Sequence, residues 1–176
     1  MAYAIRHAAH PAKLMLVSTS AQDTAHTQAK IAMFRRLGGD LAGDSAHRRY
    51  IDGDTSDDVL SAWLKIAVPL YTRAPADPLT MGRVKFQREA TSWFNRVGDE
   101  GRSFDMLAQL ASIGCPTLVM GGVDDPMLPI ECQRDIAAAN EPPLVTYKEF
   151  AGCGHGLMPD LPELMVAALR QFVKLR

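Results

Sequence analysis

The stretch Gly152-Cys153-Gly154-His155-Gly156 follows a strand-like run at 145–150, and together with an earlier stretch it decides the fold. That earlier stretch is the apolar run 116–122, which leads into Asp124-Asp125. An acid delivered by one strand and a histidine delivered by a later strand are the last two members of a hydrolytic triad in the order Ser, Asp, His. The two stretches therefore predict a parallel sheet with an acid and a histidine at the carboxyl ends of its strands.

Hydrophobic periodicity predicts alternating strands and helices around these stretches. Strands are expected at 13–17, 117–121 and 144–150, and helices at 129–139 and 161–175. Short apolar runs suit buried parallel strands, and the last segment has an apolar stripe at helical spacing. The alternation is typical of right-handed crossovers in a parallel sheet, so the predicted fold class is α/β.

An inserted block of helices is predicted between the two sheet-forming parts. Ile31, Phe34 and Leu37 recur at helical spacing, and Gly38-Gly39 is expected to end that helix. The block therefore begins soon after the first strand.

Further helices are expected within the same block. The second should begin near 55–58, where a hydroxyl is followed by acids, and should break or bend at Pro69. A third is expected over 81–98. The predicted organisation is a core segment at 1–20, a helical cap at 21–103 and a second core segment at 104–176.

Composition limits the classes of protein to which the chain can belong. It has 176 residues, of which 47% are hydrophobic and 22% charged, and its net charge is -1. This balance is ordinary for a soluble globular protein. It gives no electrostatic reason to expect nucleic acid or an anionic membrane as a partner.

Cysteine usage and the N-terminal sequence predict the compartment. Cys115, Cys132 and Cys153 are an odd number without framework spacing, which favours a reducing compartment and hence a cytoplasmic location. Arg6 and His7 interrupt the first apolar stretch, so no signal peptide is predicted. No apolar run approaches the roughly 20 residues that a membrane span requires.

The acid and histidine segments, with their order, spacing and flanking strands, resemble the C-terminal portion of the alpha/beta-hydrolase superfamily. The resemblance is strongest to proline-iminopeptidase-like enzymes and small carboxylic-ester hydrolases with a helical cap. Residues 3–18 look like the segment from the post-nucleophile helix into the sixth strand, and residues from 104 onward look like the last strands and helices. The resemblance implies a serine hydrolase that acts on a small ester or amide and uses no cofactor.

The resemblance assigns roles to the histidine and to one of the two acids. His155 takes the place of the triad base, since one ring nitrogen must accept a proton while the other donates to a buried carboxylate. The spacing Gly122-x-x-Asp125-x-x-x-Pro129 matches the family's acid position, whereas Asp124 falls at a variable one and is expected to be solvated or to cap a turn. With one histidine and no third ligand at useful spacing, no zinc or calcium site is predicted.

The nucleophile is not evident in the sequence. No Gly-x-Ser-x-Gly occurs, and the chain begins inside what looks like the helix that follows the family's serine. Ser18 and Ser20 follow the first strand without a glycine-framed elbow, and Cys153 is too close to His155 in sequence to face it. The family's two oxyanion donors would be absent with the serine, so the chain alone is expected to be inactive.

Aromatic residues in the predicted cap are the candidates for a substrate pocket. They are Trp63, Tyr71, Trp93 and Phe94. Aromatic side chains at helical spacing also commonly belong to a core, and the sequence leaves both interpretations open.

Three functions remain compatible with the sequence. The chain could be the C-terminal portion of a serine hydrolase, a non-catalytic binding module on a hydrolase scaffold, or an enzyme that activates water with Asp125 and His155. The first is favoured. Because the family's strand order places 13–17 inside the sheet, an open edge is expected there, and its partner is predicted to be the N-terminal half or a second copy of the chain.

Overall fold

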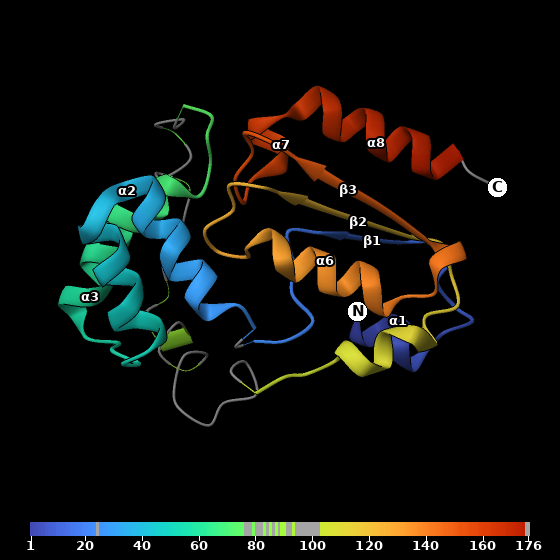
Figure 1. Cartoon of the computed structure of the whole chain (residues 1–176), viewed down its shortest axis with the longest axis horizontal. Coiled ribbons are helices and arrows are strands. Elements are labelled where there is room, and N and C mark those ends of the chain that lie inside the picture. The colour runs from blue at the N-terminus through green and yellow to red at the C-terminus, as the bar shows by residue number, and fades with distance from the viewer. Residues whose placement is uncertain are drawn as a thin grey trace.

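A computed structural model describes residues 1–23, 25–75 and 103–174, with positions 79, 83, 85, 87, 89, 90 and 93 between them. Three strands form one sheet: β1 (Leu14–Val17), β2 (Thr117–Gly122) and β3 (Val145–Phe150). They pair in the order β1-β2-β3, and both pairings are parallel. This arrangement, with helices on both sides in Figure 1, confirms the α/β prediction.

The central strand, β2, is buried along its whole length. Leu118 and Met120 pack toward one face of the sheet, while Val119 packs toward the other. Both faces are covered by helices, which explains why β2 reads as a continuous apolar run and shows no alternation of polar residues.

Two sets of helices cover the sheet. One face carries α1 (Ala2–Arg6), the 3-10 helix η4 (Leu107–Ser112) and α6 (Ile130–Ala139). The other carries α7 (Leu157–Asp160) and α8 (Pro162–Lys174). A 3-10 turn, η5 (Pro142–Leu144), leads from α6 into β3. None of the described helices is long and apolar enough to cross a membrane.

Helix α2 (Thr27–Tyr50) is interrupted at one glycine. The predicted end of a helical segment at Gly38-Gly39 is confirmed: Gly39 is non-helical, with φ 74° and ψ −169°, and a second helical segment follows directly after this kink. A glycine tolerates a positive φ, so the chain can leave the helical conformation at this one residue and bend there. The second half resumes because Ala42 and Ala46 are fully buried in the same cluster as Phe34.

The second predicted helix is present. It begins as α3 (Asp57–Ala62), continues as a π-helical turn η1 (Trp63–Ala67) and ends in the 3-10 turn η2 (Val68–Leu70), which contains Pro69. The third helix, predicted over 81–98, lies outside the described residues apart from isolated positions.

The segments that lead into and out of the block of helices lie side by side. Gln22 forms an antiparallel bridge with Asp105. The Asp23 N–H donates to the carbonyl of Phe104 at 3.2 Å, and the Met106 N–H donates to the carbonyl of Ala21 at 2.9 Å. In Figure 1, α2 and α3 lie beyond one edge of the sheet, formed by the carboxyl ends of its strands. The chain leaves β1 at this edge. The helices are therefore placed next to the carboxyl edge of the sheet.

Candidate active site

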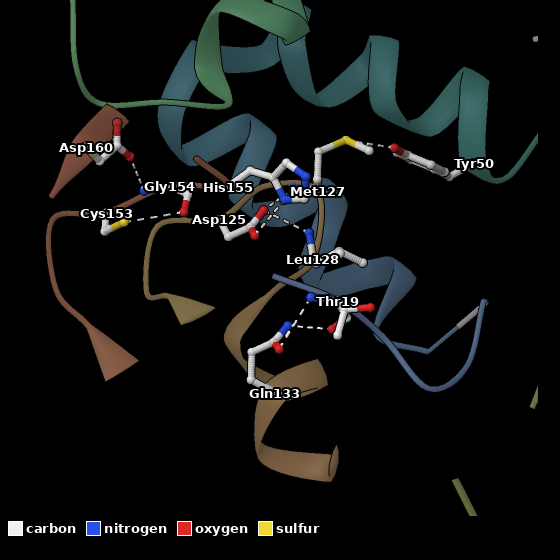
Figure 2. A network of polar contacts seen from close by, with 10 residues as sticks. All are labelled: Thr19, Tyr50, Asp125, Met127, Leu128, Gln133, Cys153, Gly154, His155 and Asp160. Atoms are coloured by element: carbon white, nitrogen blue, oxygen red, sulfur yellow. Dashed lines mark hydrogen bonds and ion pairs between the residues drawn. The ribbon is translucent and has the colours of Figure 1, made fainter. Parts of the chain in front are cut away.

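Asp125 follows β2 at this carboxyl edge, and its side chain is fully buried. Its Oδ1 accepts hydrogen bonds from the backbone N–H groups of Met127 at 2.8 Å and Leu128 at 2.9 Å. Its Oδ2 lies 2.9 Å from Nδ1 of His155 (Figure 2). The loop thus fixes the carboxylate through one oxygen and presents the other to the histidine.

His155 follows β3, and its position is set by both backbone and ring. The backbone N–H donates to the carbonyl of Tyr71 at 2.6 Å, and the Tyr71 ring meets the imidazole edge-on, with centroids 5.9 Å apart. The side chain is 34% exposed, whereas that of Asp125 is 1% exposed. With Nδ1 held by the carboxylate, Nε2 is the ring nitrogen available for proton transfer.

Two strand ends approach each other closely enough to require glycine. A Cβ on Gly122 would lie 2.2 Å from the carbonyl oxygen of Cys153 and 2.3 Å from that of Gly154. The Asp124 N–H donates to the same Cys153 oxygen at 2.9 Å. This packing brings the loop after β2 and the loop after β3 together and so sets the separation of Asp125 and His155.

Asp160 ties the histidine loop to the segment after η2. Its Oδ2 accepts from the N–H of Gly154 at 2.7 Å, and its Oδ1 accepts from those of Arg73 at 2.7 Å and Ala74 at 2.9 Å. Sequence analysis missed this residue. Its partners are backbone groups far away in the chain, so no local pattern marks it.

The two adjacent aspartates have different environments. Asp124 pairs with the guanidinium of Arg36 on α2, and its side chain is only 19% exposed. Asp124, which we expected to be solvated or to cap a turn, therefore forms an ion pair. The buried hydrogen bond to His155 belongs to Asp125.

The residues weighed as alternative nucleophiles do not contact His155. Ser18 has a left-handed backbone, φ 43°, and its hydroxyl is buried without a described hydrogen-bond partner. The Ser20 hydroxyl donates to the carbonyl of Gln22 at 2.5 Å. Burial raises the pKa of the Cys153 thiol to about 12, which disfavours the reactive thiolate.

The loop that contains these serines is held by a second residue that sequence analysis missed. Gln133 on α6 is fully buried, and its side-chain amide donates to the carbonyl of Thr19 at 2.6 Å (Figure 2). Its oxygen accepts from the Thr19 N–H at 3.4 Å. A buried glutamine in an apolar helix face was the available signal, because such a side chain needs hydrogen-bond partners.

The aromatic pocket candidates that the structure describes differ in their surroundings. Tyr71 is the one beside His155, and burial raises its pKa to about 12. Trp63 is buried in the apolar cluster of α2 and η1 and donates from Nε1 to the Tyr71 hydroxyl at 3.0 Å. Trp93 is half exposed, and Phe94 lies outside the described residues. Their role in a pocket stays a prediction.

Metal ligands around the pair can be assessed for the described residues. Within the described part of the chain, no three His, Cys, Asp or Glu side chains are grouped so that they could hold a metal ion. Proton transfer between a serine or water and the imidazole is the chemistry that the described geometry supports.

Sequence comparisons find no relative: no protein-family model matches the chain, and no curated protein matches it. Several solved structures do match the chain. Proline iminopeptidase from Mycobacterium smegmatis matches with a TM-score of 0.70 and 17% identity, over 97% of this chain and 59% of that one. MGS-M2, an alpha/beta hydrolase from a deep-sea metagenome library of the Medee basin, matches with a TM-score of 0.56 and 14% identity, over 98% and 61%.

A third similar structure is MenH from S. aureus, with a TM-score of 0.59 and 18% identity, over 97% of this chain and 63% of that one. The chain thus spans about three-fifths of the length of these structures. At such identities the similarity establishes the fold.

Proposed function

Since this chain has the fold of the C-terminal part of an alpha/beta hydrolase, we propose that it supplies the acid and base of a Ser-His-Asp triad. The observation that carries the proposal is the 2.9 Å contact between Oδ2 of the buried Asp125 and Nδ1 of His155. A buried carboxylate in this position holds the imidazole in the tautomer whose Nε2 can accept a proton.

The reaction would be acyl transfer from a small ester or amide. Nε2 of His155 takes the proton of a serine hydroxyl as the oxygen attacks the substrate carbonyl, and later returns it to the leaving group. Asp125 stays ionised and stabilises the imidazolium through its Oδ2. The resemblance of the fold to a proline iminopeptidase supports an ester or amide as the substrate class.

We place the serine and the oxyanion donors on a polypeptide segment outside these 176 residues, corresponding to the part of the similar structures that this chain does not match. The helical block at 21–103 serves as a cap in this proposal. Its contacts with the histidine loop, through Tyr71 and the amides of Arg73 and Ala74, support that role.

A fluorophosphonate probe tests the proposal. The chain by itself should not be labelled, because the probe reacts with an activated serine. Mixing with a polypeptide that carries the nucleophile-bearing half of the fold should produce labelling on that second polypeptide. Labelling of Ser18 or Ser20 in the chain alone would contradict the proposal, and failure to label a folded complex would favour the non-catalytic binding module.

The open side of β1 is the proposed contact with that half. Leu14 and Ser18 donate their N–H groups toward β2. Because alternate residues of a strand direct their backbone groups to opposite sides, the groups of Met15 and Val17 face away from β2. Within the described residues no strand pairs with them, and the Met15 side chain is half exposed. An unpaired apolar edge of this kind recruits another strand.

Amide hydrogen exchange at single-residue resolution tests this pairing. In the chain alone, Met15 and Val17 should exchange at least about tenfold faster than Leu14 and Leu16, because only the latter pair lies on the β2 side. Adding the nucleophile-bearing half should slow Met15 and Val17 selectively. Protection of Met15 and Val17 in a monomer of 19.2 kDa, checked by light scattering, would show that the edge is already covered.

A further inference from the structure

Lys30 is a buried cation on α2, close to the Asp125–His155 pair. Lys30 is only 7% exposed, and its ammonium lies 4.4 Å from the centroid of the Tyr50 ring. Among the described residues, no carboxylate lies within 4.0 Å of this ammonium. A lysine in such a place is uncommon because burying a charge without a paired anion is costly.

The surrounding charges do not neutralise this ammonium by contact. Cys132, Asp23 and Asp125 act on Lys30 from a distance and favour its charged form. Both oxygens of Asp125 are already engaged, one by two backbone N–H groups and one by His155. Burial is the largest effect and lowers the pKa of Lys30.

A second cation lies near the same aromatic residues. The Arg49 guanidinium stands 4.9 Å from the centroid of the Trp63 ring, and its charge lowers the pKa of Lys30. Trp63 meets the Tyr50 ring edge-on, with centroids 5.5 Å apart. Two positive groups therefore lie against one aromatic cluster.

The aromatic cluster contacts the loop after β2, which carries Asp125. The Tyr50 hydroxyl donates to the sulfur of Met127 at 3.4 Å, and Met127 follows Asp125 by two residues. Figure 2 shows Tyr50 reaching across to Met127 on the side of the imidazole away from Asp160. This contact connects the aromatic ring beside Lys30 to the loop that holds Asp125 and, through it, His155.

We propose that Lys30 binds a carboxylate of the substrate, so that the substrate class is an ester or amide that carries a carboxylate apart from the bond to be cleaved. This inference rests on the proposed hydrolase for there being a bond to cleave, whereas the binding of a carboxylate by this chain does not depend on a serine. A carboxylate would complete the pairing that the folded chain leaves open at the ammonium.

Binding of butyrate to the full chain tests the inference directly. The ring resonances of Tyr50 and His155 are followed by NMR while sodium butyrate, or its neutral isostere butyramide, is added. We expect butyrate to shift both rings and to bind about tenfold or more tightly than butyramide, because only butyrate offers an anion to Lys30. Equal binding of the two compounds, or no binding of butyrate, would overturn the inference.

Two substitutions locate the effect. Lys30→Met should weaken butyrate binding about tenfold or more and leave butyramide unchanged, while Lys30→Arg should retain the preference for butyrate. Lys65→Met, at an exposed position of the same block, is the matched control and should change nothing. If Lys30→Met does not fold, Lys30→Arg and the butyrate preference of the natural chain still decide.

The two proposals can fail separately. A chain that binds butyrate through Lys30 but never supports labelling of a serine would keep the anion site and remove the hydrolase. A complex whose serine is labelled, but whose chain binds butyrate and butyramide equally, would keep the hydrolase and remove the carboxylate from its substrate.

Discussion

Replacing His155 by alanine should lower the turnover of the reassembled hydrolase by about 10⁶-fold, the order of loss seen when a triad base is removed from other serine hydrolases. The loss follows because no other described residue has a ring nitrogen that is oriented by the Asp125 carboxylate and can take the proton of the serine. The measurement is the rate of hydrolysis of an activated ester by the complex of the chain with its nucleophile-bearing half.

His26→Ala is the matched control for this experiment. His26 also pairs with an aspartate, since its Nε2 lies 2.6 Å from Oδ2 of Asp135. It pairs with α6 and has no described contact with Asp125 or His155, so its removal should leave the rate within about threefold of the natural chain. A comparable loss in both variants would mean that folding or assembly, and not proton transfer, has been disturbed.

Replacing Asp125 by alanine should lower the free energy of unfolding by about 3 to 5 kcal/mol. The substitution leaves two partly buried N–H groups, those of Met127 and Leu128, and the imidazole Nδ1–H without their acceptor. Urea denaturation at neutral pH, read by far-ultraviolet circular dichroism, gives the change in unfolding free energy.

The neighbouring acid supplies the control. Asp124→Ala removes an ion pair with Arg36 near the surface, so it should cost no more than about 1 kcal/mol. Asp125→Asn should lie between the two, because its carbonyl oxygen can still accept from the backbone while its amide cannot accept from His155. A result in which Asp124→Ala is the more damaging would reverse the assignment of the two acids.

The sheet and its two loops could be predicted from the sequence because the signals are local. An apolar run such as 117–121 by itself indicates a buried strand. The three glycines between Gly152 and Gly156 indicate a loop, because glycine allows backbone conformations that other residues rarely adopt. Asp125 could be distinguished from Asp124 only by a spacing known from a family. The structure adds the physical difference, which is burial of one carboxylate and ion pairing of the other.

The features that the sequence did not predict depend on contacts between segments that are far apart in the chain. Gly38-Gly39 indicates that a helical segment ends, but not that a second segment begins directly after it; the burial of Ala42 and Ala46 accounts for that second segment. Asp160 and Gln133 bind backbone groups that are far away in sequence. Lys30 looked like any other helix residue, since its burial follows from the packing of α2 against residues that no local pattern connects to it.

The paired segments at 21–23 and 104–106 also bear on how such a protein can change during evolution. Two adjacent crossover points allow recombination to exchange the whole intervening block without altering the path of the sheet. The carbonyl of Tyr71 and the amides of Arg73 and Ala74 limit that freedom, because they hold the loop of His155 and its partner Asp160. A donor block must therefore bring an equivalent of 71–74, whereas its other helices are free to diverge.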